Sequence, residues 1–138
     1  ISLGLNYNKL QEASTLISQI TGIKKPPFKP ITGKSALAIP ETVETQEFMY
    51  SLSLENKIDE GMPIPPYLIG KKVKFSIGKK CNEFTVLYNL KQFGYEITKS
   101  EAKIIAKEVR TRLSSKIKYC LISPEELVSI FKDIRNKF

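Results

Sequence analysis

The sequence predicts a mainly helical α+β fold with a short strand or a small sheet. Three observations support this class. Apolar residues recur at helical spacing in several segments, two segments begin with helix-capping motifs, and one segment alternates strictly between polar and apolar residues. With 138 residues, of which 41% are hydrophobic, the chain can bury a modest core. No apolar run is long enough to span a membrane, so we expect a cytoplasmic protein without a membrane segment.

The first element is expected to be a helix that ends near residue 22. Asn6 or Asn8 can cap its beginning, and Gly22 stands where a glycine ends many helices. Three prolines, at positions 26, 27 and 30, then forbid a helix and favour an extended connector. The apolar face of the helix is formed by Leu10, Ala13, Leu16, Ile17 and Ile20.

The middle of the chain is expected to consist of loops around one helix. Residues 33–38 are small and predict a short loop, and residues 61–66, with three prolines, predict another. Between them, residues 40–58 favour a helix with an imperfect apolar face. The connector and the second loop divide the chain into three expected parts, at residues 1–22, 23–70 and 71–138.

The last part is expected to begin with a strand at residues 72–77. Its alternation places Val73, Phe75 and Ile77 on the buried side and leaves the lysines between them in solvent. A second strand is expected around residues 117–121.

Three helices are expected to complete the fold as a C-terminal helical lobe. Asn82 can cap the first, Thr98 and Glu101 form a capping box for the second, and Ser123 with Pro124 begins the third. The apolar faces of the last two helices are formed by Ala102, Ile105, Ala106, Val109 and Leu113, and by Leu127, Ile130, Phe131 and Ile134.

The chain contains no histidine, which is the commonest general base and metal ligand near neutral pH. Ser-His-Asp and Cys-His mechanisms are therefore excluded, and a zinc site would need a rare ligand set. The two cysteines, Cys81 and Cys120, form no metal motif, and we expect both to be reduced. We therefore expect no catalytic residue, no metal ligand and no bound cofactor in this chain alone.

The net charge of +8 favours an anionic partner. The densest basic stretch predicts contact with an anion, such as the phosphates of CoA, or with a partner through Lys71, Lys72, Lys79 and Lys80. A lysine-rich face exposed to solvent is the alternative interpretation. The run Gly33-Lys34-Ser35 matches only the end of a phosphate-binding loop, and the matching first glycine is missing.

Three glutamates, Glu41, Glu44 and Glu47, fall at helical spacing. They predict an exposed acidic face, with a cation site as the alternative.

The order of several short motifs resembles the region that follows the catalytic barrel in homocitrate synthases and 2-isopropylmalate synthases. That family has a last barrel helix ending in Thr-Gly, a proline-bearing connector, a Gly-x-x-Ala-x-Ala segment, a Pro-x-x-Val-Gly turn and a Gly-Lys strand exit. Here residues 17–23 match the end of the helix, and residues 26–38 match the connector together with the Gly-x-x-Ala-x-Ala segment. Residues 65–70 match the turn, residues 77–79 match the strand exit, and residues 92–98 follow in the same order. The resemblance covers roughly residues 5–134, and it extends to the omega subunit of homocitrate synthases divided into two polypeptides.

The departures from this family are as informative as the matches. The family has a His-Glu-x-Gly-x-His signature where this chain has Ile39, Pro40, Thr42 and Glu44. After the Gly-Lys pair the family has His-Ser-Gly, whereas this chain has Lys80, Cys81 and Asn82. The barrel, which in the family holds the metal and the oxo-acid site, is not among these residues. The resemblance therefore transfers no catalytic residue.

The resemblance implies an accessory, non-barrel subunit that aids assembly and caps the active site of an acyltransferase, with a connection to nitrogen fixation. Residues 1–22 would correspond to the last barrel helix. The resemblance implies a barrel-type catalytic subunit as partner, in a homo- or hetero-oligomer, with acetyl-CoA and a divalent metal in the assembled enzyme. The expected partner interface is formed by Leu10, Leu16, Ile17 and Ile20.

Two alternatives remain open at this point. A small basic nucleic-acid-binding module is supported by the net charge. Two observations argue against it: the sequence has no recognisable helix-turn-helix, and the last helix begins with the acidic Glu125 and Glu126. We therefore do not expect nucleic acid as a partner. A degenerate paralogue that regulates a complete synthase is the other alternative.

Overall fold

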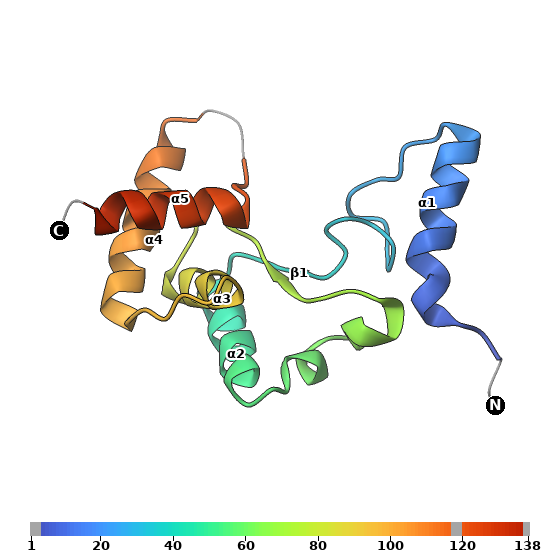
Figure 1. Cartoon of the computed structure of the whole chain (residues 1–138), viewed down its shortest axis with the longest axis horizontal. Coiled ribbons are helices and arrows are strands. Elements are labelled where there is room, and N and C mark those ends of the chain that lie inside the picture. Colours follow the sequence, from blue (N-terminus) through green and yellow to red (C-terminus); the bar gives the residue numbers. More distant parts are fainter. Residues whose placement is uncertain (1–3, 117–119, 137–138) are drawn as a thin grey trace. The chain divides into compact units, whose positions relative to one another are not determined.

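The structure is a computed structural model that describes residues 4–116 and 120–136 (Figure 1). It confirms a mainly helical α+β fold. The α-helices are α1 (Leu10–Thr21), α2 (Val43–Leu54), α3 (Glu83–Gln92), α4 (Lys99–Ser114) and α5 (Pro124–Arg135). The strands are β1 (Ala38–Ile39) and β2 (Lys74–Phe75), and the 3-10 helices are η1 (Tyr7–Lys9), η2 (Ile58–Gly61) and η3 (Pro66–Ile69). None of the helices in the described residues is long and apolar enough to cross a membrane.

The chain forms two compact units. The first, called here the N-terminal unit, comprises Ile1–Ala38 and Leu52–Lys74. The second, the C-terminal unit, comprises Ile39–Ser51 and Phe75–Phe138. The chain therefore passes between the units at both strands and again within α2.

The sheet is smaller than the sequence predicts. Only Lys74–Phe75 of the expected strand at residues 72–77 pairs, and its parallel partner is β1. The amide of Lys74 donates to the carbonyl of Leu37 at 3.4 Å, and the amide of Ser76 donates to that of Ile39 at 3.2 Å. The expected inward face is confirmed, because Val73, Phe75 and Ile77 are all buried.

The second strand expected around residues 117–121 falls mostly outside the described residues. Residues 117–119 lie outside the described part of the chain, and residues 120 and 121 are not in a strand. The observed partner, β1, follows residues expected only to form a loop. Ile122 does contact the region of β2, since its amide donates to the carbonyl of Ile77 at 2.9 Å.

The C-terminal unit has its core between α3, α4 and α5, which lie together in Figure 1. The predicted caps begin these helices. Asn82 Oδ1 accepts from the amides of residues 84 and 85, Thr98 and Glu101 form the reciprocal capping box, and Ser123 accepts from the amide of residue 126. The predicted apolar face of α4 is fully buried, and so are Leu127, Ile130 and Phe131 of α5. Ile134 is half-buried against the same core.

The N-terminal unit is built differently, because α1 has no buried residue. Asn6 lies at the start of η1, which leads into α1, and its side chain forms no cap hydrogen bond. Gly22 ends α1 in the left-handed conformation with φ 70°, as the sequence predicts. The prolines at positions 26, 27 and 30 are followed by tight turns instead of an extended connector, since the amide of Gly33 donates to the carbonyl of Lys29 and that of Ser35 to Pro27, each at 2.8 Å.

Gly33 is required by these turns. A Cβ atom at this position would lie 2.4 Å from the carbonyl oxygen of Pro27 and 2.5 Å from backbone atoms of Lys29. No side chain fits that space. The turn therefore depends on glycine for close backbone approach.

Candidate functional site

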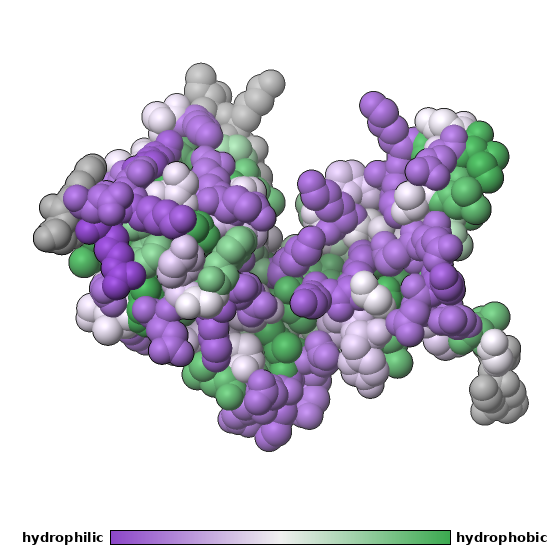
Figure 2. Space-filling view, in the orientation of Figure 1, coloured by the Kyte–Doolittle hydropathy of each residue, from purple (hydrophilic) through white to green (hydrophobic). Residues whose placement is uncertain are grey.

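One exposed apolar surface lies on α1. Leu16 is 53% exposed, Ile17 is 61% exposed and Ile20 is 75% exposed, whereas Leu10 is half-buried. Figure 2 shows hydrophobic surface over the C-terminal half of this helix. Side chains of this kind are rarely gathered in solvent on one helix, because burying each would be favourable by about 1.5–3 kcal/mol. The predicted interface residues are thus accessible within their unit, and their contact with a partner stays a prediction.

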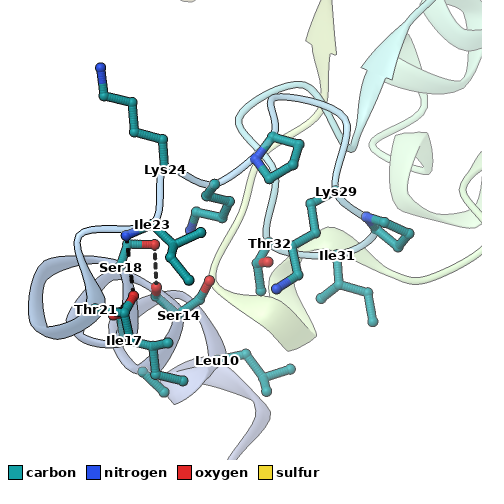
Figure 3. A pocket seen from close by; sticks show the side chains of 14 residues that line it. Leu10, Ser14, Ile17, Ser18, Thr21, Ile23, Lys24, Lys29, Ile31 and Thr32 are labelled. Atoms are coloured by element: carbon teal, nitrogen blue, oxygen red, sulfur yellow. Dashed lines mark hydrogen bonds between the residues drawn. The ribbon is translucent and has the colours of Figure 1, made fainter.

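A groove of about 500 Å³ runs between α1 and the segment that follows it (Figure 3). Helix α1 contributes Leu10, Ser14 and Ile17, and residues 23–32 form the opposite wall. Leu16 and Ile20 do not line it. The exposed apolar surface and the groove are therefore adjacent features that share only part of α1.

A second pocket in the N-terminal unit is basic. Its volume is about 390 Å³. Its lining residues, which we call the lysine pocket, are Gln11, Lys34, Leu37, Gly70, Lys71, Lys72 and Lys74. Four of these seven residues are lysines and none is acidic.

Local structure fixes the walls of the lysine pocket. Lys71 Nζ donates to the carbonyl of Gly33 at 2.6 Å, and the Lys71 amide donates to the carbonyl of Pro66 at 2.9 Å. Gly70 ends η3 in the left-handed conformation with φ 65° and turns the chain into β2. On the other wall, Gln11 Nε2 donates to the carbonyl of Ile31 at 3.1 Å.

The lysine pocket contains two of the four basic residues predicted to contact an anion. Lys71 and Lys72 line it, but Lys79 and Lys80 belong to the C-terminal unit and do not line it. Lys79 instead donates to the carbonyl of Lys116, and Lys80 is exposed. Anion contact by any of the four stays a prediction.

Sequence reasoning left Lys34 and Lys74 out of the candidate site. Lys74 belongs to the same basic stretch, but its place in the predicted strand favoured a solvent-exposed side chain, and Lys34 is 37 positions away from Lys71. The pairing of β1 with β2 brings these segments together. The weak phosphate-loop fragment at residues 33–35 was the one local hint.

Electrostatic repulsion acts within the lysine pocket. Burial of the ammonium group lowers the pKa of Lys71, and the nearby charges of Lys25 and Lys74 lower it further. Lys71 therefore loses its proton more easily than an ordinary lysine does.

The C-terminal unit contains a buried polar cluster that the sequence did not predict. Gln46 of α2 is 0% exposed, and its Oε1 accepts from Asn82 Nδ2 at 2.7 Å and from the Thr85 hydroxyl. Asn82 at the same time caps α3 through its Oδ1. The cluster ties the first half of α2 to the beginning of α3, and we interpret it as structural.

The expected acidic face at residues 41–47 is only partly correct. Glu44 and Glu47 are exposed, but Glu41 precedes α2 and is 8% exposed. Its carboxylate lies over Gly78, where a Cβ atom would be 2.7 Å from Oε2. The described residues contain no group of three cysteine, aspartate or glutamate side chains that could hold a metal ion.

Cys81 is buried beside this carboxylate. Burial, with repulsion from Glu41 as the second cause, raises the pKa of its thiol to about 12. Cys81 is therefore protonated near neutral pH and is not a nucleophile. Arg110 donates to the carbonyl of Cys81, which anchors α4 to the beginning of α3.

Comparison with known proteins relates this chain to the 2-isopropylmalate, homocitrate and citramalate synthases, and the chain resembles the C-terminal region of that family. It is 30% identical over 116 residues to a 2-isopropylmalate synthase of Methanocaldococcus jannaschii, in an alignment covering 83% of this chain and 21% of the relative. It is 28% identical over 138 residues to a homocitrate synthase of Methanothermobacter thermautotrophicus, covering 98% of this chain and 32% of the relative.

A homocitrate synthase of Nostoc is 24% identical over 135 residues, covering 98% of this chain and 34% of the relative. The chain thus spans about a fifth to a third of the length of these relatives. No family model matches the chain. The relatives do not favour the nucleic-acid-binding alternative.

Proposed function

We propose that this chain supplies the accessory, C-terminal and non-barrel part of a homocitrate synthase-like enzyme that condenses an acyl-CoA with a 2-oxo acid. The observation that carries the proposal is the form of the match: nearly the whole chain aligns with only 32% and 34% of two homocitrate synthases. In this role the chain aids assembly and caps the active site, as expected for an omega subunit.

A barrel-type catalytic subunit is the proposed partner. Support comes from α1, whose apolar face is solvent-exposed at Leu16, Ile17 and Ile20. In the resemblance, this helix corresponds to the last helix of the barrel. Docking α1 on a barrel would cover side chains that otherwise stay in water.

The proposed chemistry belongs to the partner. This chain has no histidine, and its described residues contain no group of three side chains suited to a divalent metal. The described residues therefore do not fit a metal centre, and we assign the metal and the oxo-acid site to the barrel. The contribution of this chain is positioning and exclusion of water from the reacting groups.

Co-expression tests this proposal. The chain would be produced with a tagged barrel subunit encoded in the same genome, and co-purification would be measured. We expect a complex that is lost when Leu16 and Ile20 are both replaced by lysine. Replacing Ile104, an exposed apolar residue of α4, by lysine is the matched control and should leave the complex intact.

Two results would contradict the proposal. One is the absence of any complex with every barrel subunit of that genome. The other is equal loss of the complex in the α1 variant and in the Ile104 control, since that would point to a general effect of added charge. Circular dichroism of each variant establishes that it is folded.

A further inference from the structure

The lysine pocket concentrates more positive charge than the fold of its unit requires. Four ammonium groups, from Lys34, Lys71, Lys72 and Lys74, line a space of about 390 Å³. Among residues 4–116 and 120–136, none of these four lysines forms a salt bridge with a carboxylate. Like charges held close together without counter-charges raise the free energy of the folded state.

The backbone of the pocket is held in place independently of any ligand. The hydrogen bond from Lys71 to Gly33 joins its two walls, and the pairing of Lys74 with Leu37 continues into the sheet. Because these bonds fix the chain, the lysines stay near one another despite their repulsion. Burial lowers the pKa of Lys71, and the nearby charges of Lys25 and Lys74 lower it further.

The lining indicates the kind of ligand. Lysine ammonium groups are compact charges that bind phosphate oxygens, and charge-assisted hydrogen bonds are stronger than neutral ones. Four cations match the several negative charges of two linked phosphates better than the single charge of a small monovalent anion. Gln11 adds a polar amide side chain, and Leu37 adds an apolar wall.

We propose that the lysine pocket binds the diphosphate group of a small molecule through Lys34, Lys71, Lys72 and Lys74. This proposal does not rest on the proposed function, because it is drawn from the charge and the lining of the pocket alone. Two sources share the required chemistry: free pyrophosphate and a nucleotide-type cofactor such as coenzyme A.

Calorimetric titration of the whole chain at low salt tests the proposal. The probes are pyrophosphate, coenzyme A and orthophosphate. We expect at least one of pyrophosphate and coenzyme A to bind. Any of the two that binds should do so more tightly than orthophosphate. Saturation by coenzyme A alone identifies a cofactor, and saturation by pyrophosphate alone identifies a free diphosphate.

A charge-matched pair of variants makes the test specific. The pocket variant combines Lys34→Gln, Lys72→Gln and Lys74→Gln, which are exposed side chains, and spares Lys71 because of its bond to Gly33. The control combines Lys91→Gln, Lys103→Gln and Lys107→Gln, exposed lysines of the C-terminal unit. The pocket variant should weaken binding at least about tenfold, because several charge-assisted hydrogen bonds are lost. The control should change it by less than about twofold, because none of these three lysines lines the pocket.

A third variant separates charge from folding. It combines Lys34→Arg, Lys72→Arg and Lys74→Arg, which retains the charge and should retain measurable binding. The proposal is overturned if neither diphosphate probe binds, if orthophosphate binds as tightly, or if both glutamine variants weaken binding equally. It is also overturned if a short oligonucleotide binds with dependence on these lysines while neither diphosphate probe does.

Discussion

Replacing Gln46 by methionine should destabilise the C-terminal unit. Methionine has a similar volume and removes Oε1, which accepts from Asn82 Nδ2 and from the Thr85 hydroxyl. It also removes Nε2, which is buried without a hydrogen-bond partner among the described residues, and this loss is favourable. Both donors are buried, and each unsatisfied buried donor costs about 1–3 kcal/mol. The Thr85 hydroxyl has a second, weaker acceptor in Asn82 Oδ1 at 3.4 Å, which places the total near the low end. Because the removal of Nε2 offsets part of this cost, we expect the free energy of unfolding to fall by about 1–3 kcal/mol.

Urea denaturation followed by circular dichroism measures this change. Glu47→Met is the control, because Glu47 is the next residue of α2 and is exposed. It should change the free energy of unfolding by no more than about 0.5 kcal/mol. Equal effects of the two substitutions would refute the reasoning, because the burial and the hydrogen bonds of Gln46 would then make no difference to stability.

A double-mutant cycle examines the network itself. Thr85→Val removes the hydroxyl with little change in shape. Once Gln46 is methionine, the hydroxyl has lost its principal acceptor, so its further removal should cost less than in the wild-type chain. We expect a coupling free energy of about 1 kcal/mol. Additivity within about 0.3 kcal/mol would show that the two side chains do not share a network.

Three other substitutions and reagents examine separate features. A thiol reagent at neutral pH should modify the half-buried Cys120 first and spare Cys81 until the chain unfolds, because burial raises the pKa of Cys81 to about 12; equal rates in the native chain would be inconsistent with that burial. The capping-box bonds from Thr98 lower the pKa of Glu101, so its carboxylate stabilises the folded chain above its ordinary pKa of 4.5, and this contribution is lost as pH falls through the depressed value. The melting temperature of Glu101→Gln should therefore lie below that of the wild type at neutral pH and converge with it in acid, and a constant difference at all pH values would argue against the titration. Gly33→Ala should destabilise the N-terminal unit by about 1–3 kcal/mol, because its Cβ would overlap backbone atoms, whereas Ala at the exposed Lys29 should be nearly neutral in the same denaturation assay.

The helices of the C-terminal unit could be predicted because their information is local. A capping box connects residues three positions apart, as Thr98 and Glu101 do, and an apolar face repeats every three or four residues. The physical interactions that begin and bury α4 are therefore visible in a short window of sequence. The same holds for the glycine that ends α1.

The sheet and the lysine pocket could not be predicted in the same way. The partner of β2 is chosen by contacts across more than thirty positions of the chain, and no local pattern marks Ala38–Ile39 as a strand. Lys34 joins Lys71 and Lys74 only through that pairing. For the same reason the alternation at residues 72–77 correctly gave the buried face but overestimated the length of the paired strand.

Gln46 illustrates a third limit. A glutamine in a helix is ordinarily expected in solvent, because burying an amide without partners is unfavourable. Here the partners, Asn82 and Thr85, come from a helix 36 and 39 positions away. The apolar face of α2 was expected to be imperfect, and this buried amide is part of the physical reason.

The most direct test of the proposed role is an assay of thiol release from acetyl-CoA with 2-oxoglutarate. The barrel subunit alone, this chain alone and their mixture would be compared, with the Leu16→Lys/Ile20→Lys variant as the control for assembly. We predict no thiol release by this chain alone and substantially faster release by the mixture than by the barrel alone, with the gain abolished in the variant. Thiol release by the purified chain alone, or a mixture no faster than the barrel, would contradict the account.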